Sequence, residues 1–125
     1  MNNLMNPKYP KGRNLFKDKN ILITAAAGSG IGFSTAKRFL EEGANIFISD
    51  VHQGRLDDSI DDLRKLDLGK VNGCLCNVTK DEEIETMFKE AIACFSHLDG
   101  VINNEYDEAF DMMLQVGKEL GYLTK

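Results

Sequence analysis

The sequence predicts an α/β protein in which helices cover both faces of a parallel sheet of about four strands. Two observations carry this prediction. Short apolar runs alternate with segments of helical periodicity, and a glycine-rich turn separates the first apolar run from the first helix. Such alternation is typical of a parallel sheet, because parallel strands need long crossover connections that are usually helical.

The first strand, helix and second strand are predicted between residues 20 and 50. Residues 21–23 read Ile-Leu-Ile, as in a strand that is buried on both faces, and residues 45–49 form the next apolar run. The helix between them ends near residue 42, and Gly43 follows at the place where a left-handed residue commonly ends a helix. Four residues are predicted on its inner side: Ile31, Ala36, Phe39 and Leu40.

The turn between the first strand and the helix contains Gly28, Gly30 and Gly32. Glycine permits φ > 0 and lets a ligand approach the backbone closely. The N–H groups and partial positive charge of a helix N-terminus favour a pyrophosphate, and an acidic residue after the next strand can bind an adenosine ribose. Asp50 lies 20 residues after Gly30, which is the spacing typical of that role. The pattern therefore predicts a dinucleotide site.

The turn has three other interpretations. A kinase-type P-loop would place Lys after the last glycine of its loop, whereas Ile31 follows Gly30. A methyltransferase-type nucleotide site also combines a glycine turn with an acidic strand end, so it stays open. In a third interpretation the glycines serve packing alone.

The stretch from Thr24 to Gly32 resembles the short-chain dehydrogenase/reductase family, which has T-G-x-x-x-G-x-G after its first strand. Gly30-Ile31-Gly32 matches the end of that motif, but Ala25 replaces its first glycine and the turn is one residue longer. The resemblance implies a partial Rossmann fold with strand order 3-2-1-4 and NAD as the cofactor.

The next elements are a helix over about residues 53–66 and a strand over residues 71–76. Leu56, Ile60, Leu63 and Leu66 recur at helical spacing in the first of these, and its aspartates form a solvated face. Thr79 is predicted to cap the following helix in a capping box with Glu82, before an apolar stripe that runs from residue 84 to 95.

The resemblance adds further expected cofactor contacts. Asn77-Val78 stand where the family has an Asp-Val pair that binds adenine, and Asn103-Asn104 begin its N-N-A-G motif, which Glu105 and Tyr106 interrupt. The full predicted set is Thr24, Gly28, Ser29, Gly30, Ile31, Gly32, Asp50, Asn77, Val78, Asn103 and Asn104.

Composition excludes several classes of function. The net charge of −5 disfavours a nucleic-acid partner. The sequence contains no run of 18 apolar residues, so no membrane span is predicted. Cys74, Cys76 and Cys94 fit neither zinc nor C-x-x-C spacing, so we expect reduced thiols, no metal site and a cytoplasmic location.

Three regions are expected: an N-terminal arm over residues 1–18, a dinucleotide-binding half-Rossmann domain over 19–104, and a divergent C-terminal helix within 105–125. The arm is basic and interrupted by prolines, and Leu15 and Phe16 are expected to anchor it beside the first strand. The C-terminal helix is expected over residues 107–120.

The resemblance implies catalysis by a Tyr that lies four residues before a Lys. Arg13 lies four residues after Tyr9, and Phe110 lies four residues after Tyr106. For Tyr122 the corresponding position would be residue 126, and the given sequence stops at Lys125, so no catalytic residue is assigned. We expect the NAD(H)-binding N-terminal portion of such an oxidoreductase, inactive alone. The alternative is a non-catalytic dinucleotide-binding or interaction module. The open edge of the fourth strand is expected to favour self-association.

Overall fold

The structure is a computed structural model that describes residues 8–28, 30–104 and 115–121, and its centre is a four-stranded parallel sheet. The strand order is β3-β2-β1-β4, which confirms the predicted α/β fold and its order. The strands are β1 (Asn20–Ile23), β2 (Asn45–Asp50), β3 (Val71–Leu75) and β4 (Gly100–Ile102). The helices are α1 (Ile31–Glu41), α2 (Gln53–Arg64) and α3 (Asp81–Phe95).

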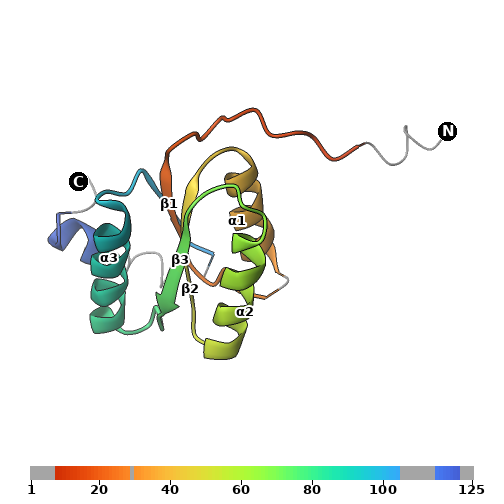
Figure 1. Ribbon diagram of the computed structural model, residues 1–125. Coiled ribbons are helices and arrows are strands. Elements are labelled where there is room, and N and C mark those ends of the chain that lie inside the picture. The colour runs from red at the N-terminus through yellow and green to blue at the C-terminus, as the bar shows by residue number, and fades with distance from the viewer. Residues whose placement is uncertain (1–7, 29, 105–114, 122–125) are drawn as a thin grey trace.

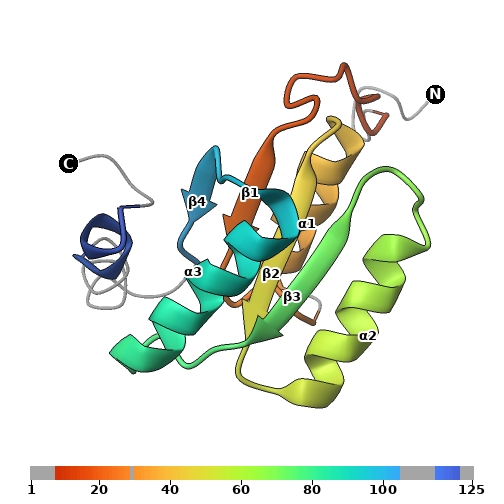
Figure 2. The same ribbon diagram turned by 60° about the vertical axis from the view of Figure 1, so that its left-hand side comes forward.

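The helices form a layer on each side of the sheet, with α1 and α2 on one face and α3 on the other (Figures 1 and 2). One buried cluster joins the inner residues of α1 and α2 to the sheet, through residues such as Leu40, Ile48 and Leu63. The second cluster joins the opposite face to α3, through residues such as Phe47 and Phe88. The direction of each crossover places the helices on these faces, because such connections are right-handed.

The parallel register brings the carboxyl ends of the strands to one edge of the sheet. Ile23 of β1 pairs with Ile48 of β2 and with Ile102 of β4. Asp50 at the end of β2 pairs with Leu75 at the end of β3. The segments that follow all four strands therefore meet at this edge, which is where open α/β sheets bind their ligands.

The predicted capping box before α3 is wrong. Lys80 is the N-cap residue of α3 and makes no side-chain cap bond. Asn77 Oδ1 instead accepts hydrogen bonds from both the N–H and the hydroxyl of Thr79, at 3.0 and 2.6 Å. Asn and Thr both favour such local bonds, and here they form a turn before the helix begins.

The N-terminal arm is attached to α1 and not beside β1. The ring of Phe16 packs edge-on against Phe39 with centroids 4.8 Å apart, whereas Leu15 is 59% exposed. Glu42 Oε1 accepts the backbone N–H groups of Arg13 and Leu15, at 2.7 and 3.2 Å. These bonds hold the pKa of the Glu42 carboxyl below its usual range.

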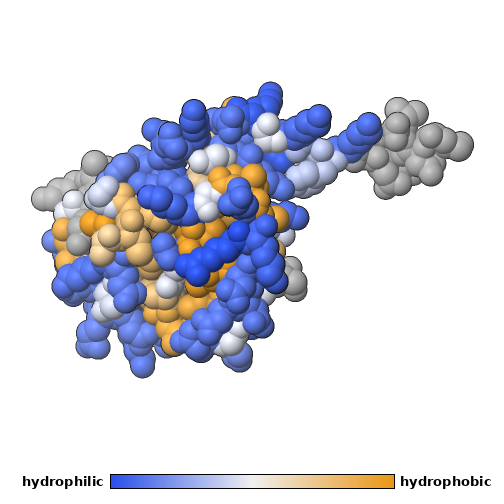
Figure 3. Space-filling model, in the orientation of Figure 1, coloured by the Kyte–Doolittle hydropathy of each residue, from blue (hydrophilic) through white to orange (hydrophobic). Residues whose placement is uncertain are grey.

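Apolar surface remains exposed at the edge of the sheet. Figure 3 shows apolar surface gathered between the two helical layers, around the edge strand β3, with hydrophilic surface on either side. Leu75 at the end of this strand is 44% exposed. Among the described residues, no helix is long and apolar enough to cross a membrane.

The C-terminal prediction falls largely outside the described residues. Residues 115–119 are helical, and Val116 is buried in the cluster beneath α3. Leu120 lies in the turn that follows, and residues 107–114 of the helix predicted over 107–120, together with Glu105 and Tyr106, lie outside the part that the structure describes.

Candidate functional site

Thr24 joins the turn after β1 to the end of β4. It is fully buried, and its hydroxyl donates to Asn103 Oδ1 at 3.0 Å while accepting the N–H of Asn104, also at 3.0 Å. Asn104 Nδ2 in turn donates to the carbonyl of Ala25 at 3.1 Å. These hydrogen bonds join the three predicted cofactor residues to one another and hold the turn after β1 against the end of β4.

The turn contains two residues in the left-handed region of backbone space. Ala25, which stands where the family motif has Gly, has φ = 49°, and Gly28 has φ = 91°. A side chain in this region is unfavourable, so Ala25 carries a local strain that glycine would not. The N–H of Gly28 donates to Ser59 Oγ of α2 at 2.8 Å, so this N–H is already paired with the protein.

Gly30 is the N-cap residue of α1 and borders open space. A Cβ built on it would meet no described atom within 4 Å, and no described side chain caps the helix. Its φ of −86° is ordinary for any residue, so the backbone conformation does not require glycine here. Ile31, predicted on the inner side of the helix, is instead 78% exposed. The buried stripe of α1 consists of Gly32, Ala36 and Leu40, and Ile31 lies beside it.

Gly32 has the opposite surroundings. A Cβ built on it would lie 2.6 Å from the carbonyl oxygen of Ala25 and 2.7 Å from Asn104 Nδ2. The first turn of α1 therefore rests directly on the glycine turn, and only a residue without a side chain permits this contact. Ser29, the remaining predicted residue of the turn, lies outside the described residues.

Asp50 ends β2 at the same edge of the sheet and is 5% exposed. Its Oδ1 accepts the N–H of His52 at 3.0 Å and pairs with Arg55 Nη2 at 2.9 Å. Its Oδ2 accepts no hydrogen bond from any described residue. The described residues thus place their donors on one oxygen of this carboxylate and none on the other.

The two residues expected to bind adenine are engaged elsewhere. Asn77 Oδ1 accepts both bonds from Thr79 described above, and the Asn77 N–H donates to Glu83 Oε1 at 2.9 Å. Val78 is buried in the cluster beneath α3, at 5% exposure. An adenine amino group would have to share an oxygen that already accepts two hydrogen bonds.

Arg55 and Ser59 belong to the site, although their positions in the sequence gave little reason to select them. Both project from α2 toward the turn, and the side chain of Arg55 lies 3.0 Å from a Cβ built on Gly28. The one signal for them in the sequence is the extra residue in the turn, because a longer turn needs contacts with a neighbouring element. The sequence alone does not say which element supplies it.

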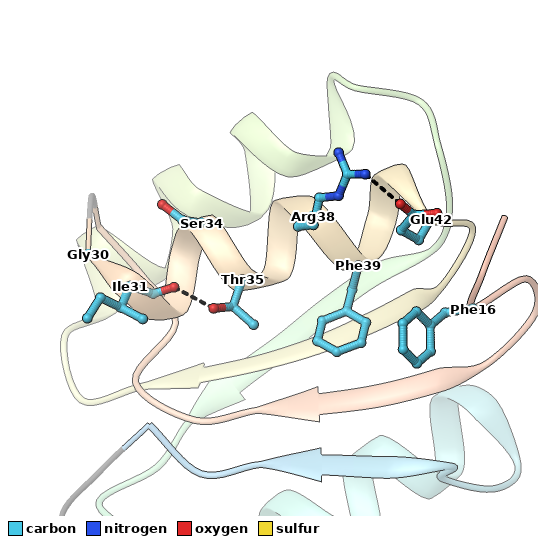
Figure 4. A pocket seen from close by; sticks show the side chains of 8 residues that line it. All are labelled: Phe16, Gly30, Ile31, Ser34, Thr35, Arg38, Phe39 and Glu42. Atoms are coloured by element: carbon cyan, nitrogen blue, oxygen red, sulfur yellow. Dashed lines mark hydrogen bonds and ion pairs between the residues drawn. The ribbon is translucent and has the colours of Figure 1, made fainter. Parts of the chain in front are cut away.

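A separate hollow of about 620 Å³ runs along α1 from its N-terminus. Figure 4 shows Ile31, Thr35 and Phe39 along the same side of the helix, with Phe16 of the arm facing Phe39. Arg38 and Glu42 form an ion pair at 2.6 Å at the far end. Of the described glycines in the turn, Gly30 alone lines this hollow.

The described part of the chain contains no cluster of metal ligands, and its Cys74 thiol is held protonated. No group of three or more His, Cys, Asp or Glu side chains there could hold a metal ion. Burial, followed by a hydrogen bond with Glu90, raises the pKa of Cys74 far above its usual range, so this thiol stays protonated at neutral pH.

Comparison with known proteins agrees with this geometry. The short chain dehydrogenase family matches residues 19–105. The chain is 39% identical over 104 residues to a Mycobacterium tuberculosis enzyme, (5R,7aS)-5-hydroxy-7a-methyl-1-oxo-2,3,5,6,7,7a-hexahydro-1H-indene-carboxyl-CoA reductase, and this match covers 83% of the chain and 40% of the relative. A short chain dehydrogenase from Mycobacterium smegmatis has a similar crystal structure, with a TM-score of 0.76 and 39% identity over 88% of this chain and 50% of that one.

A further solved structure contains a cofactor. The short chain dehydrogenase/reductase from Burkholderia phymatum in complex with NAD matches with a TM-score of 0.65 and 27% identity, and it covers 69% of this chain and 30% of that one. The chain therefore spans at most half the length of each of these proteins. The match with the family covers the strands, the glycine turn and Asp50, and on this basis the chain belongs to the short chain dehydrogenase family.

Proposed function

We propose that this chain binds NAD(H) at the carboxyl edge of its sheet, as the cofactor-binding portion of an oxidoreductase that acts on alcohols or carbonyls. The observation that carries the proposal is the pairing of two vacant positions. Gly30 gives the start of α1 no side-chain cap and borders open space, and one carboxylate oxygen of Asp50 has no donor among the described residues.

Each position suits one part of a dinucleotide. The free N–H groups and the dipole at the start of α1 favour a pyrophosphate, which can approach because Gly30 has no side chain. Asp50 Oδ2 can accept hydrogen bonds from the hydroxyls of the adenosine ribose. The exposed side chain of Ile31 then offers an apolar contact beyond the pyrophosphate. The residues of the turn are thus arranged to hold and orient the molecule.

Asp50 favours NAD over NADP in this proposal. A 2′-phosphate placed roughly 4 Å from the carboxylate would be disfavoured by on the order of 4 kcal/mol per pair of unit charges at an effective dielectric near 20. The neighbouring guanidinium of Arg55 offsets part of that repulsion, because it already pairs with Asp50 at 2.9 Å. The preference is therefore smaller than Asp50 alone would produce.

The chain alone is proposed to bind the cofactor without enzymatic turnover. A bound nicotinamide supplies the hydride chemistry, but proton transfer by a placed acid or base typically contributes about 10²–10⁴-fold. No Tyr lies four residues before a Lys in the 125-residue sequence. Absorbance at 340 nm, followed with a panel of alcohols and ketones, tests this. Turnover that survives exhaustive purification and is lost in Asp50→Ala would contradict it.

Binding itself is tested by calorimetric titration with NAD. We expect Asp50→Ala to weaken binding roughly 10- to 150-fold, the value of a hydrogen bond to a charged group. Asp61→Ala is the matched control, because Asp61 is an exposed carboxylate on the outer side of α2. Equal affinity of the wild type and Asp50→Ala would refute the assignment of Asp50.

A further inference from the structure

We propose that the open edge of β3 pairs with the β3 edge of a second copy of this chain, antiparallel and around a two-fold axis at Gly73. The inference concerns the surface at the β3 side of the sheet and does not rest on the proposed NAD site. It identifies the strand that carries the association, the register of the two strands and the side chains that favour this partner.

The hydrogen bonds between β2 and β3 leave alternate residues of β3 facing outward. The Ile46 N–H donates to the Lys70 carbonyl and the Cys76 N–H donates to the Asp50 carbonyl, each at 2.9 Å. In such a ladder the residues that bond one neighbouring strand alternate with residues whose N–H and C=O groups point away from it. In β3 the outward residues are Val71, Gly73 and Leu75. No further strand lies beyond β3 in the described part of the chain.

Arg64 of α2 covers the start of this edge. Its Nε donates to the Val71 carbonyl and its Nη2 donates to Asn72 Oδ1, each at 2.9 Å. Among the residues that the structure describes, none outside the sheet gives the outward backbone groups of Gly73 a comparable partner. An edge with unpaired groups readily accepts another strand. The β3 edge is thus covered at Val71 and open from Gly73 onward.

The open edge is complementary to itself. In an antiparallel pair around Gly73, the two Gly73 residues exchange both N–H···O bonds, and Val71 of each copy lies opposite Leu75 of the other. The Leu75 N–H then donates to the Val71 carbonyl in place of Arg64. Leu75 is 44% exposed, and it lies in the apolar surface around β3 that Figure 3 shows. Pairing with Val71 of the second copy would cover part of this surface.

A hollow of about 390 Å³ beside Gly73 shows which side chains of α2 face this edge. Asp57, Asp61 and Arg64 line it together with Asn72 and Gly73. The helix therefore presents carboxylates and one guanidinium on the side where a second copy would lie.

These charges complement those of a second copy. Ile60 of α2 lies over Gly73, with its Cδ1 3.1 Å from a Cβ built on that glycine. An axis at Gly73 therefore places the two α2 helices side by side on one face of the extended sheet, in opposite directions. Arg64 lies level with Val71, and Asp57 lies two turns earlier, about 10 Å along the helix. Arg64 of each copy would then face Asp57 of the other.

Arg64 thus exchanges a carbonyl of its own chain for a carboxylate of the second copy. Two such ion pairs form in the symmetric dimer, and they favour a second copy over an unrelated strand. Asp61 lies near the axis and faces its counterpart, which keeps the pairing weak and reversible.

Sedimentation equilibrium of the 125-residue chain tests this by measuring the dimer dissociation constant. Reductant is present throughout, because the exposed Cys94 could otherwise link two chains. Asp57→Arg places like charges opposite Arg64. Asp62→Arg is the matched control, because it makes the same change of charge at a 63% exposed carboxylate that lines a different hollow, beside Gly28. Circular dichroism establishes that each variant is folded.

We expect Asp57→Arg to weaken the dimer about tenfold or more, because two attractive pairs become two repulsive pairs. The double exchange Asp57→Arg with Arg64→Asp should restore the dissociation constant to within about threefold of the wild type. Asp62→Arg should leave it unchanged.

Leu75→Pro tests the backbone pairing without a change of charge. The Leu75 N–H points to the open edge, so proline removes no bond to β2, and edge strands tolerate proline. It removes both bonds to Val71 that the symmetric pair contains, so we expect a dimer about tenfold weaker.

The outcomes decide the proposal without reference to NAD. A wild-type dimer that both Asp57→Arg and Leu75→Pro weaken, and that Asp62→Arg leaves intact, supports it. A wild type that stays monomeric at concentrations on the order of 1 mM overturns it. A dimer that Leu75→Pro leaves intact, or that Asp62→Arg weakens as much as Asp57→Arg does, also overturns it, because another surface or the net charge then governs association.

Discussion

An alanine substitution should mainly weaken NAD binding at Gly30 and mainly lower the stability of the fold at Gly32, although the two glycines are only two residues apart in the same turn. At Gly32 an added Cβ would lie 2.6 Å from the carbonyl oxygen of Ala25 and 2.9 Å from the Cα of Ala26. At Gly30 the same Cβ would meet no described atom within 4 Å. One glycine is thus needed for packing within the protein, and the other leaves space outside it.

The contacts determine the expected magnitudes. Both of these atoms facing Gly32 belong to the backbone, and Asn104 Nδ2, at 2.7 Å, is held by the Ala25 carbonyl, so none can move aside cheaply. Overpacking of this kind costs about 1–3 kcal/mol. For a domain of this size 1 kcal/mol lowers Tm by roughly 4–8 °C, so Gly32→Ala should melt about 10 °C lower. Gly30→Ala should lose at most about 1 kcal/mol, because glycine is somewhat better than alanine at an N-cap.

Thermal melting and calorimetric titration with NAD together test this pair. Gly30→Ala should melt close to the wild type and bind NAD more weakly, because its methyl group enters the space proposed for the pyrophosphate. Gly32→Ala should lose stability whether or not NAD is present. Equal losses of Tm in the two variants, or a larger loss for Gly30→Ala, would refute the distinction between packing and ligand space.

Three further predictions concern stability and association. Ala25→Gly should raise stability by about 1 kcal/mol, since it removes a side chain at φ = 49°, and a lower Tm in the variant would contradict this. The backbone N–H groups of Arg13 and Leu15 hold the pKa of Glu42 low, so the contribution of Glu42 to folding is complete above about pH 4.3 and is lost as pH falls through the lower folded-state pKa. Urea unfolding of Glu42→Gln should therefore depend less on pH below that point than unfolding of the wild type, and parallel curves would refute the assignment. The chain should self-associate through an edge of its sheet, and a sharp monomer peak by light scattering with one cooperative melt well above room temperature would count against it.

The strands and helices could be predicted because the relevant signals are local and agree with one another, and the strand order was implied by the family resemblance. Apolar runs at 21–23 and 45–49 correspond to β1 and β2, and the periodic segments correspond to the three helices. Gly43 has φ = 94° after α1, as a left-handed helix end requires. In each case the backbone preference and the burial pattern select the same structure.

The wrong predictions concern residues whose sequence pattern fits two local arrangements. Thr79 could cap a helix or bond Asn77, and the turn before α3 favours the second. Ile31 fits an apolar helical stripe, but the buried stripe of α1 lies one residue further along, beginning at Gly32, and Ile31 is exposed. Sequence spacing does not decide between such local alternatives.

The Asp50–Arg55 pair and the Gly28–Ser59 bond depend on how α2 returns past the lengthened turn. That placement is tertiary, so the sequence identified Asp50 but not the residue that neutralises it. The adenine contact expected of Asn77 was implied by the family, and the Asn77 side-chain oxygen already accepts two hydrogen bonds within the chain.

The most direct test of the proposed site is a two-dimensional amide NMR spectrum of the ¹⁵N-labelled chain, recorded as NAD is added. We expect the largest shifts in the turn over residues 24–32 and around Asp50 to Arg55, where the open space at Gly30 and the free carboxylate oxygen lie. Amides in the middle of α3, on the opposite face of the sheet, should stay in place. Shifts confined to α3 or to the β3 edge, or no shifts at millimolar NAD, would contradict the account.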